Sequence, residues 1–192
     1  MILCSGFKTF EKNPSKCYEK QTYNYFCKIN FVNFFSKIIQ QSSKKYNVDP
    51  NLVKSIICVE SSGNIKAISR SKAIGLMQIK QFSAGKEVYR FQGKSGQPSI
   101  YDLYNPKTNI EIGTAYIHIL QEKNLSGIHN LEILRYATIV SYSNGPNMLL
   151  KIFSNNRLSA IKKINKLKKQ EFLNYIKKNT QNCKLGNILK KL

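Results

Sequence analysis

Two amphipathic segments of the chain begin with a capping side chain followed directly by proline, a strong start signal for an α-helix. Asp49-Pro50 opens one segment and Asn105-Pro106 opens the other. Asp and Asn are preferred N-caps, and proline is preferred at the first helical position. Apolar residues then recur at spacings of three and four, whereas strand-like alternation is scarce. These signals predict an all-α fold class.

Further stretches carry the same helical periodicity. Gly113 lies inside the segment that Asn105-Pro106 opens and would permit close packing there, since glycine otherwise weakens a helix. Residues 91–105 are rich in Gly, Ser, Pro and aromatics, and we expect a loop there. Helices are expected over 25–46, 47–64, 105–124, 130–146 and, as two short basic ones, 156–179.

A length of 192 residues suits one domain. We expect residues 24–192 to form it and residues 1–23, which are polar and irregular, to form a loose arm. The start of that arm, MILCSGF, resembles the end of a lipoprotein signal, which would make Cys4 the position of an outer-membrane lipid anchor. The basic segment and apolar core of an export signal are missing. No apolar run reaches the ~18 residues of a membrane-spanning helix.

The formal net charge of +21 comes from 31 basic and 10 acidic residues. It has two readings: a compositional drift toward Lys on solvated faces, or a polyanionic partner such as nucleic acid, a membrane surface or an anionic wall polymer. Only four of the basic residues are Arg. Because nucleic-acid readout favours Arg, we expect no nucleic acid as a partner.

Cysteine spacing argues against a metal centre. The five cysteines include no C-x-x-C pair, so no zinc site is expected. Gly-rich phosphate-binding motifs and nucleophile elbows are also absent. We expect neither a metal nor a cofactor.

Glu60 is the acid that stands out. It follows Ile56 by four residues and Ile57 by three, so it shares their inward side in the last turn of the expected helix. Loss of water and the negative helix end both favour the neutral acid, which makes Glu60 a candidate proton donor. The alternative is an exposed or structurally hydrogen-bonded Glu. No obvious second carboxyl accompanies it, so catalysis would need a substrate that supplies its own nucleophile.

The segment that begins at Glu60, ESSGNIKAISRSKAIGLMQIK, strongly resembles the E-S-x-x-N…A-x-S…G-L-M-Q-I signature of the soluble-type lytic transglycosylases. Three further blocks agree in order and spacing, and the last of them, LRYATIVSYSNG, matches the family pattern LRYAxxxSYANG. The resemblance extends over about residues 30–180, and its blocks are 60–80, 87–99, 105–117 and 134–145.

Membership of that family implies a goose-lysozyme-type, α-rich lysozyme-like domain with a substrate cleft. It implies non-hydrolytic cleavage of the β-1,4 bond between N-acetylmuramic acid and N-acetylglucosamine in peptidoglycan glycan strands. The 6-hydroxyl of the muramic acid attacks its own C1 and leaves a 1,6-anhydro end. The match to small, membrane-bound members implies endo-type action, a monomer, and a location on the periplasmic face of the outer membrane.

The resemblance also assigns roles by position. Glu60 would be the acid and then the base, Ser71 would touch the muramic acid sugar, and Ser69 would lie behind it. Each role has an alternative: Ser69 could cap a turn, Met77 could be packing, and Tyr142 could be a core residue with its hydroxyl satisfied locally. The positions carried over are Glu60, Ser69, Ser71, Met77, Gln78, Tyr142 and Asn144.

One departure from the family pattern concerns the C-terminus. The family usually carries Arg-x-Tyr there, with the Tyr reaching toward the catalytic Glu, and no Tyr follows Tyr175 in this chain. A wall-binding module of the same fold with weakened turnover is therefore an alternative. A hydrolytic lysozyme and a basic nucleic-acid binder are two others.

Overall fold

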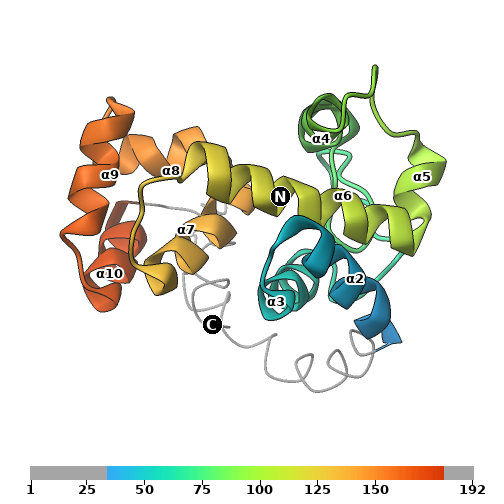
Figure 1. The fold of residues 1–192 in the computed structure, drawn as a ribbon, viewed down its shortest axis with the longest axis horizontal. Coiled ribbons are helices and arrows are strands. Elements are labelled where there is room, and N and C mark those ends of the chain that lie inside the picture. The colour runs from blue at the N-terminus through green and yellow to red at the C-terminus, as the bar shows by residue number, and fades with distance from the viewer. Residues whose placement is uncertain (1–33, 180–192) are drawn as a thin grey trace, which may run out of the picture.

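Helices dominate residues 34–179, the part of the chain that the computed structural model describes (Figure 1). In this part no strand forms, and two isolated bridges join Ile68 to Ile74 and Ile74 to Ile79. The all-α prediction is confirmed. The helices are α2 (Ser36–Tyr46), α3 (Pro50–Glu60), α4 (Lys86–Phe91), α5 (Ile100–Tyr104), α6 (Pro106–Ile119), α7 (Leu131–Asn144), α8 (Pro146–Phe153), α9 (Arg157–Asn165) and α10 (Lys169–Asn179), with π-helical turns η2 (Gln81–Gly85) and η3 (Leu120–Asn124).

Several predictions about the chain ends concern residues outside this range. The loose arm over 1–23, the anchor position Cys4 and the C-terminal segment beyond 179 all lie outside the described residues. Between residues 34 and 179, none of the helices combines the length and apolar character of a membrane span.

The predicted helix caps are confirmed. The Asp49 carboxylate accepts a hydrogen bond from the backbone N–H of Asn51 at 2.8 Å, and Pro50 occupies the start of α3. Asn105 and Asn130 cap α6 and α7 in the same way. Gly145 adopts a φ of +88° directly after α7, so the chain can turn sharply into α8.

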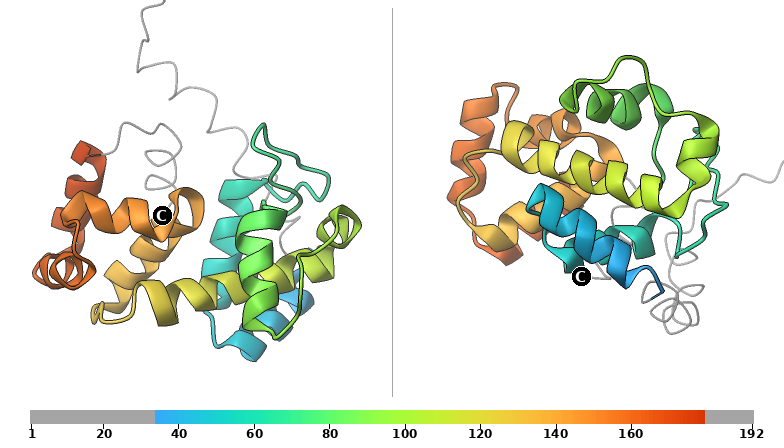
Figure 2. Two further views of the ribbon diagram at one scale, coloured as in Figure 1. Left: turned by 90° about the horizontal axis from the view of Figure 1, so that it is seen from above. Right: turned by 45° about the vertical axis from the view of Figure 1, so that its right-hand side comes forward.

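Helix α6, continued by η3, runs through the middle of the molecule (Figures 1 and 2). Helices α4 and α5 lie toward one of its ends, and α8, α9 and α10 gather at the other. The buried side chains accordingly form two clusters. One joins α2, α3 and α6 to the segment after α3, and the other lies among α7, α8, α9 and α10.

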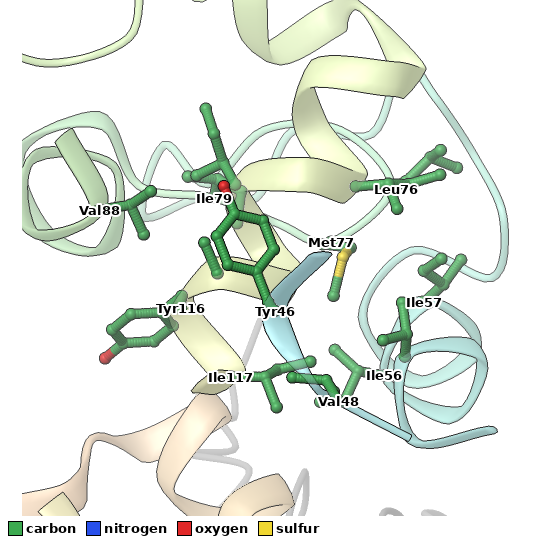
Figure 3. Close-up of a cluster of buried hydrophobic side chains, with 14 of the residues drawn as sticks. Tyr46, Val48, Ile56, Ile57, Leu76, Met77, Ile79, Val88, Tyr116 and Ile117 are labelled. Carbon is green, nitrogen blue, oxygen red and sulfur yellow. The ribbon is translucent and has the colours of Figure 1, made fainter. Parts of the chain in front are cut away.

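The turn over residues 74–79 packs tightly on α6 (Figure 3). A side chain at Gly113 would bring its Cβ into collision with the sulfur of Met77, so glycine at this position allows the close approach that was predicted. The buried Asn109 amide donates to the carbonyls of Ile74, at 3.0 Å, and Leu103, at 2.7 Å, while its oxygen accepts from the Met77 N–H at 2.8 Å. These contacts hold the turn against the helix.

The expectation of a loop throughout 91–105 is wrong in part, because α5 forms within it. The Ser99 hydroxyl accepts from the Asp102 N–H, and the Asp102 carboxylate accepts from the Ser99 N–H in return. Hydrogen bonds from the Ser99 hydroxyl and backbone lower the pKa of Asp102. A helix of five residues is too short to show an apolar stripe, and this reciprocal capping box is the signal that marks it.

Candidate active site

A hollow of about 290 Å³ opens beside the end of α3. The end of α7, the segment after α3 and one side chain of α6 complete its walls. Six of the seven predicted site residues come together here, and Met77 is the exception. The lining residues are Glu60, Ser69, Ser71, Ala73, Gln78, Lys80, Ser83, Ala84, Tyr116, Tyr142, Ser143, Asn144 and Gly145.

Glu60 is the last residue of α3 and is half-buried. Ile56 and Ile57, one turn earlier, are fully buried, so the predicted inward side of the helix is confirmed. The Ser143 hydroxyl donates a hydrogen bond of 2.7 Å to Glu60 Oε1. Among the described residues that line the hollow, Glu60 is the sole carboxyl.

Ser143 was not among the predicted site residues. Its partner Glu60 lies 83 positions away in the sequence, and only the packing of α7 beside α3 brings them together. The motif comparison nevertheless contains a signal: this chain has Ser143 where the family pattern LRYAxxxSYANG has alanine. The hydrogen bond from Ser143 to Glu60 is therefore one that an alanine at this position could not make.

The two predicted serines have different environments. The Ser69 hydroxyl accepts from the backbone N–H of Ala73 at 2.9 Å, so Ser69 caps the turn, as its alternative reading stated. Ser71 is exposed, and its hydroxyl lies 3.1 Å from that of Ser69. Ser71 is therefore the serine that presents polar surface, and Ser69 supports it from behind.

Gln78 and Asn144 are anchored through their amide nitrogens. Gln78 donates to the carbonyls of Ala67 and Gly75, at 3.1 and 3.0 Å. Its backbone has a φ of +50°, an unusual conformation for a residue with a side chain. Asn144 donates to the carbonyl of Val140 at 3.2 Å. Both side chains are held in place at the edge of the hollow.

Met77 is fully buried and does not line the hollow, so its side chain is packing (Figure 3). Its backbone carbonyl accepts a hydrogen bond of 2.9 Å from the Tyr142 hydroxyl. Burial, and then the charge of Glu60, raise the pKa of Tyr142 well above its ordinary value. The phenol therefore stays protonated and keeps donating to the turn. Tyr142 borders the hollow while its hydroxyl is satisfied internally.

Tyr116 extends the aromatic wall from α6. Its ring centroid lies 5.5 Å from that of Tyr142 at an interplanar angle of 64°, an edge-to-face pair. Burial, followed by the charge of Glu87, raises the pKa of Tyr116 to about 12. Sequence reasoning missed Tyr116 as a lining residue, because its place in an amphipathic helix predicts only packing.

Comparisons with known proteins agree with this geometry. The Transglycosylase SLT domain family matches residues 37–165. The chain is 54% identical to a protein named membrane-bound lytic murein transglycosylase E from Buchnera aphidicola subsp. Baizongia pistaciae, over 100% of this chain and 91% of that protein. It is 41% identical to an endo-type membrane-bound lytic murein transglycosylase A from Enterobacter sp., over 93% of this chain and 86% of the relative.

Solved structures show the same fold. The 70 kDa soluble lytic transglycosylase of Escherichia coli superposes on 79% of this chain with a TM-score of 0.53 and 22% identity. This chain spans only 25% of the length of that protein. The predicted lysozyme-like fold class is confirmed. Taken together, the matched domain and the close relatives show that the chain belongs to the lytic transglycosylases that carry the Transglycosylase SLT domain.

Proposed function

We propose that this protein is a peptidoglycan lytic transglycosylase that cleaves the β-1,4 bond between N-acetylmuramic acid and N-acetylglucosamine without water. The observation that carries the proposal is Glu60 as the sole carboxyl among the lining residues of a hollow otherwise rich in hydroxyl and amide groups. Ordinary glycoside hydrolysis requires two carboxyls. A reaction with one carboxyl is complete only when the substrate provides the nucleophile.

The proposed reaction uses Glu60 twice. As an acid, it protonates the glycosidic oxygen, and the bond from that oxygen to C1 of the muramic acid breaks. As a base, the resulting carboxylate then takes the proton of the 6-hydroxyl on the same sugar while that oxygen bonds to C1. The acid is regenerated, and the product carries a 1,6-anhydro ring. No water enters the products.

The other residues would bind and orient the sugar. Ser71 is exposed in the hollow and would touch the muramic acid, with Ser69 holding it from behind. Gln78 and Asn144 are anchored through their amide nitrogens, so their amide oxygens would accept hydrogen bonds from sugar hydroxyl groups. Tyr142 would border the bound ring while it steadies the turn at Met77. We therefore assign Met77 a supporting role.

Endo-type action and a membrane-associated, periplasmic location belong to the same proposal. Relatives are named as membrane-bound, and one of them as endo-type. Glycan strands would be the partner, on the periplasmic face of the outer membrane, with the protein acting as a monomer and binding no nucleic acid. A lipid anchor at Cys4 would hold it there.

Digestion of purified peptidoglycan tests this function. We expect soluble muropeptides that mass spectrometry finds lighter by one water than the products of a lysozyme digest, with no new reducing ends. Hydrated products would contradict the proposal and point to a hidden second acid. Retained binding without any products would favour the wall-binding module.

Removing the Ser143 hydroxyl should slow the reaction. In Ser143→Ala, Glu60 loses the 2.7 Å hydrogen bond that orients its carboxyl, so we expect kcat to fall by about fivefold at unchanged KM. The effect is modest because water can replace the hydroxyl and alanine is the family's own residue there. Steady-state kinetics on soluble glycan fragments check it.

A matched variant separates orientation from packing. Ser143→Thr keeps the hydroxyl and should retain most of the wild-type kcat. An unchanged kcat in Ser143→Ala, or an equal loss in Ser143→Thr, would contradict the positioning role.

A further inference from the structure

A second hollow of about 440 Å³ adjoins the first one. Ser83 lines both, so the two surfaces are continuous. The first hollow is bordered by hydroxyls and amides around Glu60, whereas the second is bordered mainly by charged side chains. The residues lining it are Phe82, Ser83, Lys86, Glu87, Arg90, Lys94 and Gly96.

The charge of the second hollow is positive. Lys86 and Arg90 are both exposed and lie four residues apart on α4, which places them on one face of the helix. Lys94 follows just beyond the helix, with its ammonium 5.2 Å from the centroid of the Tyr89 ring. Glu87 is the single acid among the lining residues. Three cations therefore face one carboxylate.

An apolar side chain stands at the same rim. Phe82 is 74% exposed, although a phenylalanine normally gains stability by burial. A partner that suits this surface combines carboxylates for Lys86 and Arg90 with apolar groups for Phe82. A glycan strand without stems keeps only the lactyl carboxylate of each muramic acid and offers no apolar side chain, so it matches this combination only in part.

We infer that the second hollow binds the peptide stem that the muramic acid carries. This inference rests on the proposed function, because it assumes that the sugar occupies the first hollow. The stem leaves the sugar through a lactyl ether and contains free carboxylates and methyl side chains. A sugar bound next to Glu60 directs that substituent along the shared surface at Ser83 toward Lys86 and Arg90. The protein thereby distinguishes stem-bearing strands from strands without stems.

Two substrates and two double variants test the inference. The substrates are soluble glycan strands with their stems intact and the same strands after an amidase has removed the stems. In Lys86→Ala/Arg90→Ala, we expect the KM for stem-bearing strands to rise by about three- to tenfold, the range typical of two exposed ion pairs, at unchanged kcat. The KM for stripped strands, which keep only the lactyl carboxylate next to the sugar, should rise by less than about twofold. Lys162→Ala/Lys166→Ala removes the same charge from exposed positions around α9 and should change neither KM.

The other possible results contradict either the stem site or the proposed function, and they can be told apart. An unchanged KM for stem-bearing strands, or an equal rise for both substrates, overturns the stem site and leaves the proposed function intact. If the wild type cleaves neither substrate, the proposed function fails. Calorimetric binding of a stem-bearing muropeptide and of its stem-free disaccharide then decides the site separately. If the wild type binds the muropeptide more tightly than the disaccharide, and Lys86→Ala/Arg90→Ala loses this difference, the stem site is supported. If the wild type binds both ligands equally, the stem site is overturned.

Discussion

Replacing Glu60 by glutamine is expected to lower the rate of anhydro-muropeptide release by about a thousandfold, within the range that one acid–base group contributes. Glutamine keeps the size of the side chain and its hydrogen-bonding capacity toward Ser143. It cannot donate a proton to the glycosidic oxygen or take one from the attacking hydroxyl. Since no other carboxyl among residues 34–179 lines the hollow, none of the described side chains at its walls can replace it as an acid. Quantitative mass spectrometry of the released products over time measures the loss.

The control for this variant is an acid outside the hollow. Glu122→Gln changes an exposed carboxyl in η3 and should leave the rate at the wild-type level. Circular dichroism and the melting temperature of Glu60→Gln should match the wild type. Substantial product release by a folded Glu60→Gln protein would remove Glu60 from the mechanism.

The largest effect on stability is expected for Asn109→Ala. Asn109 is 1% exposed, and its amide satisfies the Met77 N–H and the carbonyls of Ile74 and Leu103. Alanine leaves these backbone groups buried without their partner, and each such group costs about 1–3 kcal/mol. Because relaxation makes the costs less than additive, we expect the free energy of unfolding to fall by about 4 kcal/mol. Urea unfolding followed by circular dichroism measures the change.

A surface asparagine provides the comparison. Asn174 on α10 is exposed and accepts a hydrogen bond from Gln170, so Asn174→Ala should change the free energy of unfolding by less than about 0.5 kcal/mol. A loss below about 1 kcal/mol in Asn109→Ala would show that the turn does not depend on this amide.

The helix starts were predictable because they depend on neighbouring residues. Asp49 caps α3 by a hydrogen bond to a backbone group two residues away, and Asn105 caps α6 by one three residues away. Such contacts are local, so the residue pattern reports them directly. Helix α5 was missed because five residues hold less than two turns, too few for the periodicity on which the other predictions rested.

In the candidate site, too, some features could be predicted from the sequence and others could not. Glu60 could be identified as a candidate acid because it follows Ile56 by four residues and Ile57 by three, and because it opens the motif. Six of the residues that the motif singled out line the hollow, but the motif did not reveal that the Met77 side chain is buried against Gly113. A motif records which residues recur together, whereas burial depends on the helix that packs against them.

By itself, the sequence determined the helical class and the helix starts that depend on caps, and it singled out Glu60 as the candidate acid. The tertiary structure decided which groups surround that acid. Ser143 meets Glu60 because α7 ends beside α3, and Tyr142 supports the turn at Met77 because that turn is held on α6 by Asn109. These contacts join residues 32 to 83 positions apart. Their geometry depends on how helices pack, which no local pattern of residues encodes.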